Sequence, residues 1–338
     1  MTQEESMWCK QVDYNNGWHV LPEMKIPPAE MLLQRMQEQR WKQLLCPVVI
    51  DREAAIETFK ADKQIAKIFS SVLDVYDMLP LHPDLAFDAA WRTFEYTVET
   101  YANVAWGYVE HPFVDTVKNK LCTEVLCHLS DKDVDMKEAI SHLFSNLSLN
   151  CIQYSVTRIF HNKQLSVAPQ TPHVYDRTKD IIDVTTLEHI RNSYTGVLGF
   201  MEAKAIRDIS RRFYRLMNGI DADFNGKIID SLTLNKSLQM LINVILYTSR
   251  CERFHGDFYT PFRSTRTRMD TYYNYYYLTV ASYTLFWCVL HKLLSQKGLP
   301  QFVLACSIKN SVVETFARMN TILPNDIKKK DNSNEGES

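Results

Sequence analysis

Glycine is scarce in this sequence. Only 9 of the 338 residues are glycine, less than half of the roughly 7% that is average for proteins. Loops that cradle phosphate groups need closely spaced glycines, because their backbone must come close to the ligand. Neither GxGxxG nor GxxxxGK[ST] occurs here, and sheets of short hairpins also need residues that tolerate positive φ. The scarcity therefore excludes the common nucleotide-binding loops and predicts a mostly helical chain.

An excess of charge of one sign is also missing. The chain has 38 Lys and Arg against 40 Asp and Glu, which gives a formal net charge of -2. A protein that coats nucleic acid indiscriminately is basic overall. Any site for a polyanion must therefore be a local patch.

The eight cysteines form no CxxC pair, which indicates a reduced, cytosolic protein. Cys122, Cys127 and His128 lie close together in the sequence, but no second half of a four-ligand zinc site accompanies them. We therefore expect neither a metal nor another cofactor.

Long apolar runs are missing as well. The N-terminal residues are polar and acidic, unlike a signal peptide. The longest apolar run, 278–290, is interrupted by Thr and Ser and is shorter than the ~20 residues that span a bilayer. We expect a buried helix at this run, in a soluble cytoplasmic protein that does not associate with a membrane.

The spacing of apolar residues predicts two long helices joined by a short loop that contains Pro80 and Pro83. The first lies within 52–78, and Asp84 can cap the second. Such a pair forms an antiparallel hairpin. Apolar side chains recur at spacings of three and four at Ile65, Ile68, Phe69, Val72, Leu73 and Tyr76, and again at Phe87, Trp91, Phe94, Val98, Tyr101 and Ala105.

Other helices are predicted along the rest of the chain. Thr185 and Glu188 resemble a capping box that opens a short helix. The segment 145–160 mixes β-branched and aromatic residues and is interpreted as a strand or an irregular piece, and 163–176 as a linker. The remaining predicted helices are 29–45, 113–129, 134–147, 201–217, 235–250, 267–294 and 309–319.

The most informative segment runs from Tyr247 to Asp257. Four residues separate Arg250 from His255 at the end of a predicted long helix, and Gly256 follows at once. Glycine commonly ends a helix, which lets His255 turn toward Arg250 instead of staying ~140° away around the helix. No other arginine in the chain has a histidine four to six residues beyond it.

This arrangement resembles the signature of the HEPN superfamily, most closely its Apea-like branch, over roughly 60–107 and 235–296. The resemblance implies an all-α fold: a HEPN-like four-helix bundle with a long, mostly helical insertion and an N-terminal extension. The expected parts are an N-terminal arm and helix (1–51), a first helical pair (52–109), an inserted helical subdomain (110–230), a second helical pair with the motif (231–322) and a disordered tail (323–338).

The resemblance also implies an activity, that of a metal-independent endoribonuclease cleaving single-stranded or loop RNA to 2',3'-cyclic phosphate and 5'-hydroxyl ends. A histidine exchanges protons near neutral pH, so His255 would be the general base or acid. An arginine offers a planar donor fork to phosphate oxygens, so Arg250 would bind and stabilise the scissile phosphate.

Family members commonly dimerise so that two such pairs face each other across a cleft. The resemblance therefore implies a homodimer with a composite active site. Many members are toxins or defence effectors, which implies RNA as the substrate and an antitoxin or regulatory partner. Two positions differ from the family pattern. Cys251 stands where many members have Asn, Asp or His, and Asp257 stands where members silenced by nucleotidyl transfer have tyrosine.

The residues around the motif carry a net positive charge. Between 250 and 268, five arginines face Glu252 and Asp257, a local charge of 5 - 2 = +3. Phosphate contacts of this kind give salt-dependent affinity. The residues expected to bind RNA or support the site are Arg253, Asp257, Tyr259, Arg263, Arg266 and Arg268. A surface on which unpaired bases could stack is offered by Tyr272, Tyr273, Tyr275, Tyr276 and Tyr277.

Plainer interpretations stay open at this point. Arg250 and His255 can simply cap a helix C-terminus, and the tyrosines can belong to the bundle core or a dimer interface. The arginines at 207, 211, 212 and 215 fit a solvated helix face or an RNA track. At the level of function, the alternatives are a non-catalytic module that binds nucleic acid, nucleotide or protein, and a scaffold whose functional part is 110–230.

Overall fold

The computed structural model describes residues 27–107, 115–161, 172–194, 202–254 and 268–323. The predicted all-α class is confirmed, because helices make up most of this part of the chain. Its strands form one antiparallel hairpin, β1 (Ala222–Phe224) and β2 (Lys227–Ile229). The N-terminal arm, most of the expected linker and almost all of the expected tail lie outside the described residues.

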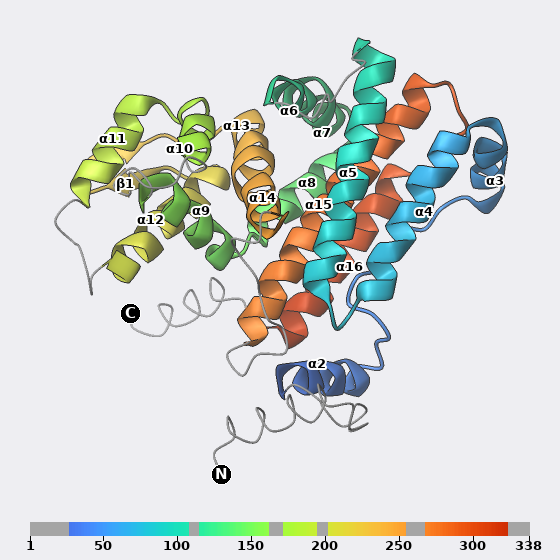
Figure 1. Ribbon diagram of the computed structural model, residues 1–338, viewed down its shortest axis with the longest axis horizontal. Helices are drawn as coiled ribbons and strands as arrows, with labels where there is room; N and C mark the ends of the chain where they lie inside the picture. Colours follow the sequence, from blue (N-terminus) through green and yellow to red (C-terminus); the bar gives the residue numbers. More distant parts are fainter. Residues whose placement is uncertain (1–26, 108–114, 162–171, 195–201, 255–267, 324–338) are drawn as a thin grey trace.

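The helices follow the chain in an order that Figure 1 shows by colour. Two of them, η2 and η3, are π-helical, with wider turns than an α-helix. The helices are α2 (Pro27–Glu38), α3 (Arg52–Ala61), α4 (Lys63–Met78), α5 (Pro83–Trp106), α6 (Asp115–Lys120), η2 (Leu121–Cys127), α7 (His128–Lys132), α8 (Val134–Ser145), α9 (Leu149–His161), α10 (Pro172–Lys179), α11 (Val184–Ser193), α12 (Glu202–Met217), α13 (Leu234–Gln239), η3 (Met240–Leu246), α14 (Tyr247–Phe254), α15 (Met269–Gln296) and α16 (Ala305–Ile322).

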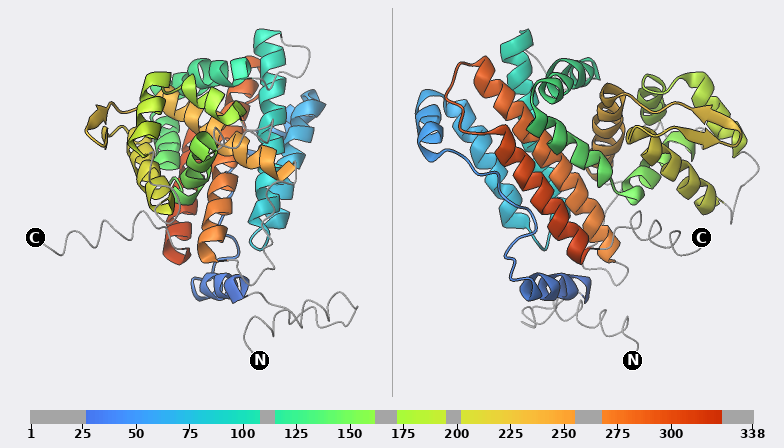
Figure 2. Two further views of the ribbon diagram at one scale, coloured as in Figure 1. Left: turned by 60° about the vertical axis from the view of Figure 1, so that its left-hand side comes forward. Right: turned by 180° about the vertical axis from the view of Figure 1, so that it is seen from behind.

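Helix α15 is the centre of a bundle that fills one half of the molecule. It packs along α5, which packs on α4, while α16 packs on α15 and α8. Figures 1 and 2 show these helices side by side from several directions. Most of α15 is buried, including the whole apolar run 278–290. By length and composition α15 is apolar enough to cross a membrane, but its surface is used in packing, as in the core of a soluble protein.

The tyrosines at the start of α15 belong to the core. All five are buried, and three hydroxyls donate to backbone carbonyl oxygens of neighbouring segments. Tyr273 donates to Asn146 at 3.0 Å, Tyr276 to Pro80 at 3.2 Å and Tyr277 to Leu143 at 3.1 Å. The interpretation that places these tyrosines in the bundle core is therefore the one supported, because these rings and their polar ends are used to join α15 to other elements.

The second half of the molecule contains α9 to α12, the β-hairpin and the helix that carries the motif. α9 packs on α12 and α10, and η3 contacts α9 and α10. α13, η3 and α14 follow one another without a break. In Figure 1, α14 lies between this half and the bundle. The motif helix thus reaches the junction of the two halves.

The stretch 52–78, expected as one helix, is two helices that meet at Asp62. Its carboxylate accepts hydrogen bonds from the backbone N–H groups of Gln64 and Ile65, which caps α4, and pairs with Lys297 at 2.6 Å. The predicted apolar stripe of α4 is largely buried, except that Leu73 is exposed and Val75 takes a core position.

Two local predictions are wrong in the middle of the chain. The segment 145–160 is neither a strand nor irregular, because Leu149–His161 is the helix α9. Its apolar residues recur along one buried face, and tertiary packing overrides their β propensity. Asp183, not Thr185, caps α11, because its carboxylate accepts the hydrogen bond from the Thr186 N–H group.

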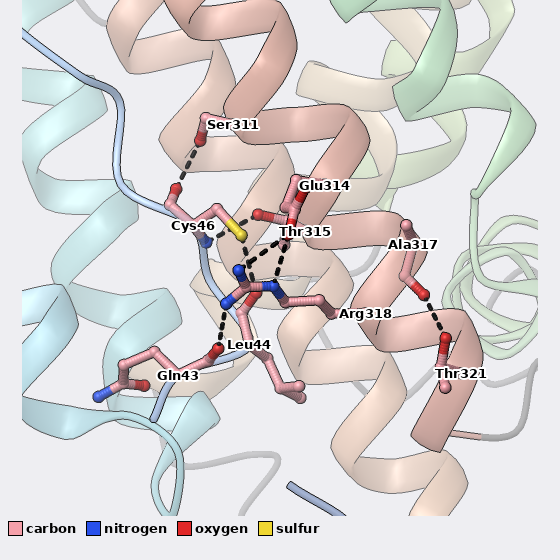
Figure 3. A network of polar contacts seen from close by, with 9 residues as sticks. All are labelled: Gln43, Leu44, Cys46, Ser311, Glu314, Thr315, Ala317, Arg318 and Thr321. Carbon is pink, nitrogen blue, oxygen red and sulfur yellow. Dashed lines mark hydrogen bonds and ion pairs between the residues drawn. The ribbon is translucent and has the colours of Figure 1, made fainter. Parts of the chain in front are cut away.

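The first helix ends at Glu38 instead of 45, and the next segment is held on α16 (Figure 3). The Cys46 N–H donates to Thr315 Oγ1 at 2.9 Å, and Ser311 Oγ donates to the Cys46 carbonyl at 2.6 Å. Arg318 donates to the Gln43 carbonyl at 2.9 Å. These bonds satisfy the backbone of a segment that has no regular structure of its own.

The expected division into bundle and insertion stays a prediction. Helix α8 falls inside the expected insertion 110–230, yet it packs against α16 and α15 within the bundle. The motif helix has its main packing partners among α9, α10, α12 and η2.

Candidate functional site

Arg250 is carried by a helix that is fixed in the core over its preceding turns. All seven residues of η3 are buried, and Asn243 Nδ2 donates to Asn119 Oδ1 at 2.9 Å. Since Asn119 belongs to α6, this bond joins the motif helix to the segment after α5. Arg250 therefore stands on a rigid element and not on a free loop.

The Arg250 guanidinium lies between α14 and α5. Its Nη2 atom is 3.6 Å from Glu95 Oε2, and the two side chains are 24% and 21% exposed. Its Nη1 atom is 4.0 Å from the Cys251 sulfur. The group is thus partly screened from solvent and still reachable, with a carboxylate beside it.

Tyr247, one turn before Arg250, joins three further elements. The Lys118 ammonium is 3.7 Å from the centroid of its ring and the Arg177 guanidinium carbon is 4.8 Å from it. The Trp91 ring of α5 has its centroid 6.1 Å away. Arg177 also donates to Thr248 Oγ1 at 3.4 Å. Cations near an aromatic face are stabilised by the ring's charge distribution.

We call Lys118, Arg177 and Arg250 together with Tyr247 the cation cluster. Its three cations come from α6, α10 and α14, which are far apart in sequence. Lys118 is 1% exposed, so its charge acts on the surroundings from inside the protein.

The Tyr247 hydroxyl is not placed to act as a base. Burial and the nearby Cys251 thiol raise its pKa, while the charges of Arg177 and Arg250 oppose that rise. The phenol therefore stays neutral at physiological pH and serves as an aromatic surface. Burial likewise raises the pKa of Cys151 and of Cys288 to about 12, so these thiols are not nucleophiles at neutral pH.

The structure places only part of the predicted site. Arg250 is described with its side chain, Arg253 only as part of α14, and Arg268 is exposed at the start of α15. The other predicted residues lie outside the described residues: His255, Gly256, Asp257, Tyr259, Arg263 and Arg266.

The arginines of α12 form a solvated face. Arg207, Arg211 and Arg215 are exposed, Arg215 donates to the Asp221 carbonyl, and Arg212 pairs with Asp208 at 3.1 Å. Contacts within their own region account for Arg212 and Arg215, and Arg207 and Arg211 face solvent, which favours the solvated face over an RNA track.

Sequence reasoning missed four residues of the site: Glu95, Lys118, Arg177 and Tyr247. Tyr247 could have been found, because a residue three positions before Arg250 shares its helix face. The other three come from separate segments, and no spacing rule connects them to the motif.

A metal centre is not evident in the described residues, which contain no group of three or more His, Cys, Asp or Glu side chains close enough to hold an ion. Cys122 is buried inside η2.

No protein-family model matches the chain, and no significant match was found among curated proteins or solved structures. The function must therefore be argued from the site itself, and the likeness to the HEPN pattern enters as a hypothesis.

Proposed function

We propose that this protein is a metal-independent endoribonuclease of HEPN type that cleaves single-stranded or loop RNA. The observation that carries the proposal is the cation cluster, in which Lys118 and Arg177 meet on the ring that precedes Arg250 by one turn. Positively charged side chains from α6, α10 and α14 lie close together around Arg250, the residue that the HEPN motif would use to bind the phosphate. Such a focus attracts a polyanion although the chain as a whole is slightly acidic.

The shape of the Arg250 guanidinium suits it to bind the scissile phosphate of RNA. Its fork can donate two parallel hydrogen bonds to phosphate oxygens. The Glu95 carboxylate occupies part of that fork. A phosphate must therefore compete with Glu95, which makes the pair a resting state that substrate opens.

The chemistry uses the residues of the motif. His255 takes the proton of the 2'-hydroxyl, the 2'-oxygen forms a bond to phosphorus, and the bond from phosphorus to the 5'-oxygen breaks. Arg250 stabilises the negative charge on the phosphorane. The 5'-oxygen needs a proton, which the histidine of a second copy supplies in a homodimer. The products are a 2',3'-cyclic phosphate and a 5'-hydroxyl.

The test is cleavage of a labelled single-stranded RNA in excess chelator. We expect wild type to cut, and Arg250→Ala and His255→Ala to lose at least about 100-fold of the rate, on the scale of one lost charge-stabilising or proton-transfer group. Arg207→Ala, an exposed arginine of α12, is the matched control and should keep full activity. Activity that requires an added divalent metal, or that survives both substitutions, would overturn the mechanism.

Dimerisation is tested separately by light scattering and by mixing variants. If the site is composite, activity should fall on dilution below the dissociation constant of the dimer. A monomer that cleaves at full rate would remove the homodimer from the proposal. A toxin or defence role in the cytoplasm, with an antitoxin or regulatory partner, follows from the same resemblance and forms part of this proposal.

A non-catalytic binding module is the second candidate. The ion pair between Arg250 and Glu95 favours it, because a carboxylate beside the guanidinium opposes the build-up of negative charge on a phosphorane during cleavage. RNA binding without cleavage across the pH range, lost in Arg250→Ala, would select this candidate.

A further inference from the structure

A pocket of about 240 Å³ lies between α9, α14 and α15, directly beside the motif helix. One of its walls is Ser249, the residue before Arg250. Its polar and aromatic lining comes from three helices: Asn150 and Tyr154 from α9, Ser249 from α14, and Thr271, Asn274 and Tyr275 from α15.

The lining is mostly apolar in area, with aromatic rings and several neutral polar groups, and carries no formal charge at neutral pH. It consists of two carboxamides, two aliphatic hydroxyls, two tyrosines, Leu278 and Cys151. Burial raises the pKa of the Cys151 thiol to about 12, so it too is neutral. A neutral lining with donors, acceptors and rings suits an uncharged heterocycle better than a phosphate.

The Asn274 amide is held in one orientation. Its Oδ1 accepts a hydrogen bond from the Ser148 hydroxyl, so Nδ2 is the donor that the side chain can offer a ligand. Cys151 Sγ is 3.9 Å from the Asn274 carbonyl oxygen, which ties the same turn of α15 to α9. Asn150, in the first turn of α9, supplies the second carboxamide. Two carboxamides can read the hydrogen-bonding edge of a base.

Three arginines are neighbours of residues that line this neutral pocket. Arg250 follows Ser249 directly, exposed Arg268 precedes Thr271 by one turn, and the Arg158 guanidinium carbon is 5.5 Å from the centroid of the Tyr154 ring. Cations next to lining residues suit a sugar–phosphate chain, and the neutral hollow suits its base.

We propose that this pocket is a subsite for one unpaired nucleobase of an RNA strand whose phosphate is held by Arg250. The inference rests on the proposed function, since it gives the pocket to the substrate of the same site. The volume is below the ~300–1,000 Å³ typical of pockets for drug-sized ligands, which fits a single base. The base stacks on a tyrosine and bonds to a carboxamide, as unpaired bases do in RNA-binding proteins.

The proposal is tested with substitutions that fill or alter the pocket, and RNA binding is measured separately from RNA cleavage. Thr271→Phe places a ring in the pocket, and Asn150→Ala removes one carboxamide. Thr321→Phe, an exposed threonine of α16, is the matched control for size. The probes are a short labelled single-stranded RNA and the same oligomer with abasic ribose at successive positions. Affinities are measured by fluorescence anisotropy in chelator, with folding checked by circular dichroism.

We expect wild type to bind the RNA roughly tenfold more tightly than an oligomer abasic at the pocket position, on the scale of one stacked base. Thr271→Phe should lose that advantage and bind both oligomers alike, Asn150→Ala should reduce it and change the base preference, and Thr321→Phe should keep it. If the two pocket variants behave as wild type, or wild type ignores every abasic position, the subsite is overturned. The proposed function still stands in that case, because Arg250→Ala tests it. If wild type does not bind the RNA at all, both the base subsite and the proposed function are overturned.

Discussion

The Nη2 atom of Arg250 lies 3.6 Å from Oε2 of Glu95, so the arginine of the motif is bridged to a carboxylate on another long helix. The pair joins α14 to α5 at the junction of the two halves of the molecule. A phosphate that binds Arg250 must compete with the Glu95 carboxylate, because both accept hydrogen bonds from the same guanidinium N–H groups. Substituting Glu95 should therefore lower stability but favour RNA binding, whereas substituting Arg250 should weaken both.

Glu95→Gln should strengthen RNA binding by roughly threefold while lowering the free energy of unfolding by about 0.5–1 kcal/mol, the scale of a partly exposed ion pair. The substitution removes a negative charge that repels phosphate and competes for Arg250. Anisotropy and urea unfolding measure the two effects. Glu57→Gln, on the exposed side of α3, is the control. Weaker RNA binding by Glu95→Gln would mean that the carboxylate positions Arg250 for its ligand.

Tyr247→Leu should lower the free energy of unfolding by about 2–3 kcal/mol, because it removes the ring on which two cations rest and opens space beside Trp91. Tyr247→Phe keeps the ring and should cost less than about 1 kcal/mol. Urea unfolding followed by circular dichroism compares them. Equal losses in both variants would assign the stabilisation to the hydroxyl instead of the aromatic face.

Thr315→Val should destabilise the protein by about 1–3 kcal/mol, because it removes the acceptor of the buried Cys46 N–H group (Figure 3). Thr321→Val is the matched control on the same helix, since the Thr321 hydroxyl is exposed and bonds only within its own turn, to the Ala317 carbonyl. Thermal unfolding of the two variants gives the comparison. A loss in Thr321→Val as large as that in Thr315→Val would contradict the role of this bond.

Asp62→Asn should make stability less dependent on pH in the acid range. Burial acts to raise the pKa of the Asp62 carboxyl, but hydrogen bonds from Lys297 and from the Ile65 and Gln64 N–H groups outweigh it and hold the pKa below its ordinary value of 3.8. A carboxyl with a depressed folded pKa stabilises the protein above its unfolded pKa, and that contribution is lost as the pH falls through the folded pKa.

Wild type should therefore exceed Asp62→Asn by about 1 kcal/mol at neutral pH, with a difference that shrinks below pH 3.8. Unfolding in urea between acid and neutral pH measures it, with Asp51→Asn, a cap of α3, as the control. A difference that stays constant down to the lowest pH would show that the charge of Asp62 is not involved.

The spacing of apolar residues was sufficient to predict the long helices. It did not predict a helix end or a turn that depends on polar side chains. The core positions of α5, such as Phe87, Trp91 and Phe94, are buried as predicted. The break at Asp62 depends on a carboxylate that caps α4 and pairs with Lys297, which is distant in sequence. The hairpin at 222–229 was missed although Asn225 and Gly226 turn it, with φ of 52° and 94°, the conformation that favours an Asn-Gly turn.

The residues of the candidate site also fall into those that the sequence could predict and those that it could not. Arg250 could be chosen from the sequence because its spacing to His255 is local. Glu95, Lys118 and Arg177 could not, because only the packing of α5, α6 and α10 around α14 brings them together. The pocket beside Ser249 depends on α9, a segment that was predicted not to be helical.

The wide turns of η3 set the rotational phase of the motif. Residues of an α-helix advance by about 100° each, and a π-helical stretch, with its i to i+5 bonding, advances by less. Every side chain after Leu246 is therefore rotated relative to an uninterrupted α-helix, which directs Tyr247 and Arg250 to the junction with α5. Converting 240–246 to regular α-helical turns with the same number of residues would turn both away while leaving the composition of the motif intact. The chemistry of the site thus depends on a helix angle that the Arg-x4-His pattern does not encode.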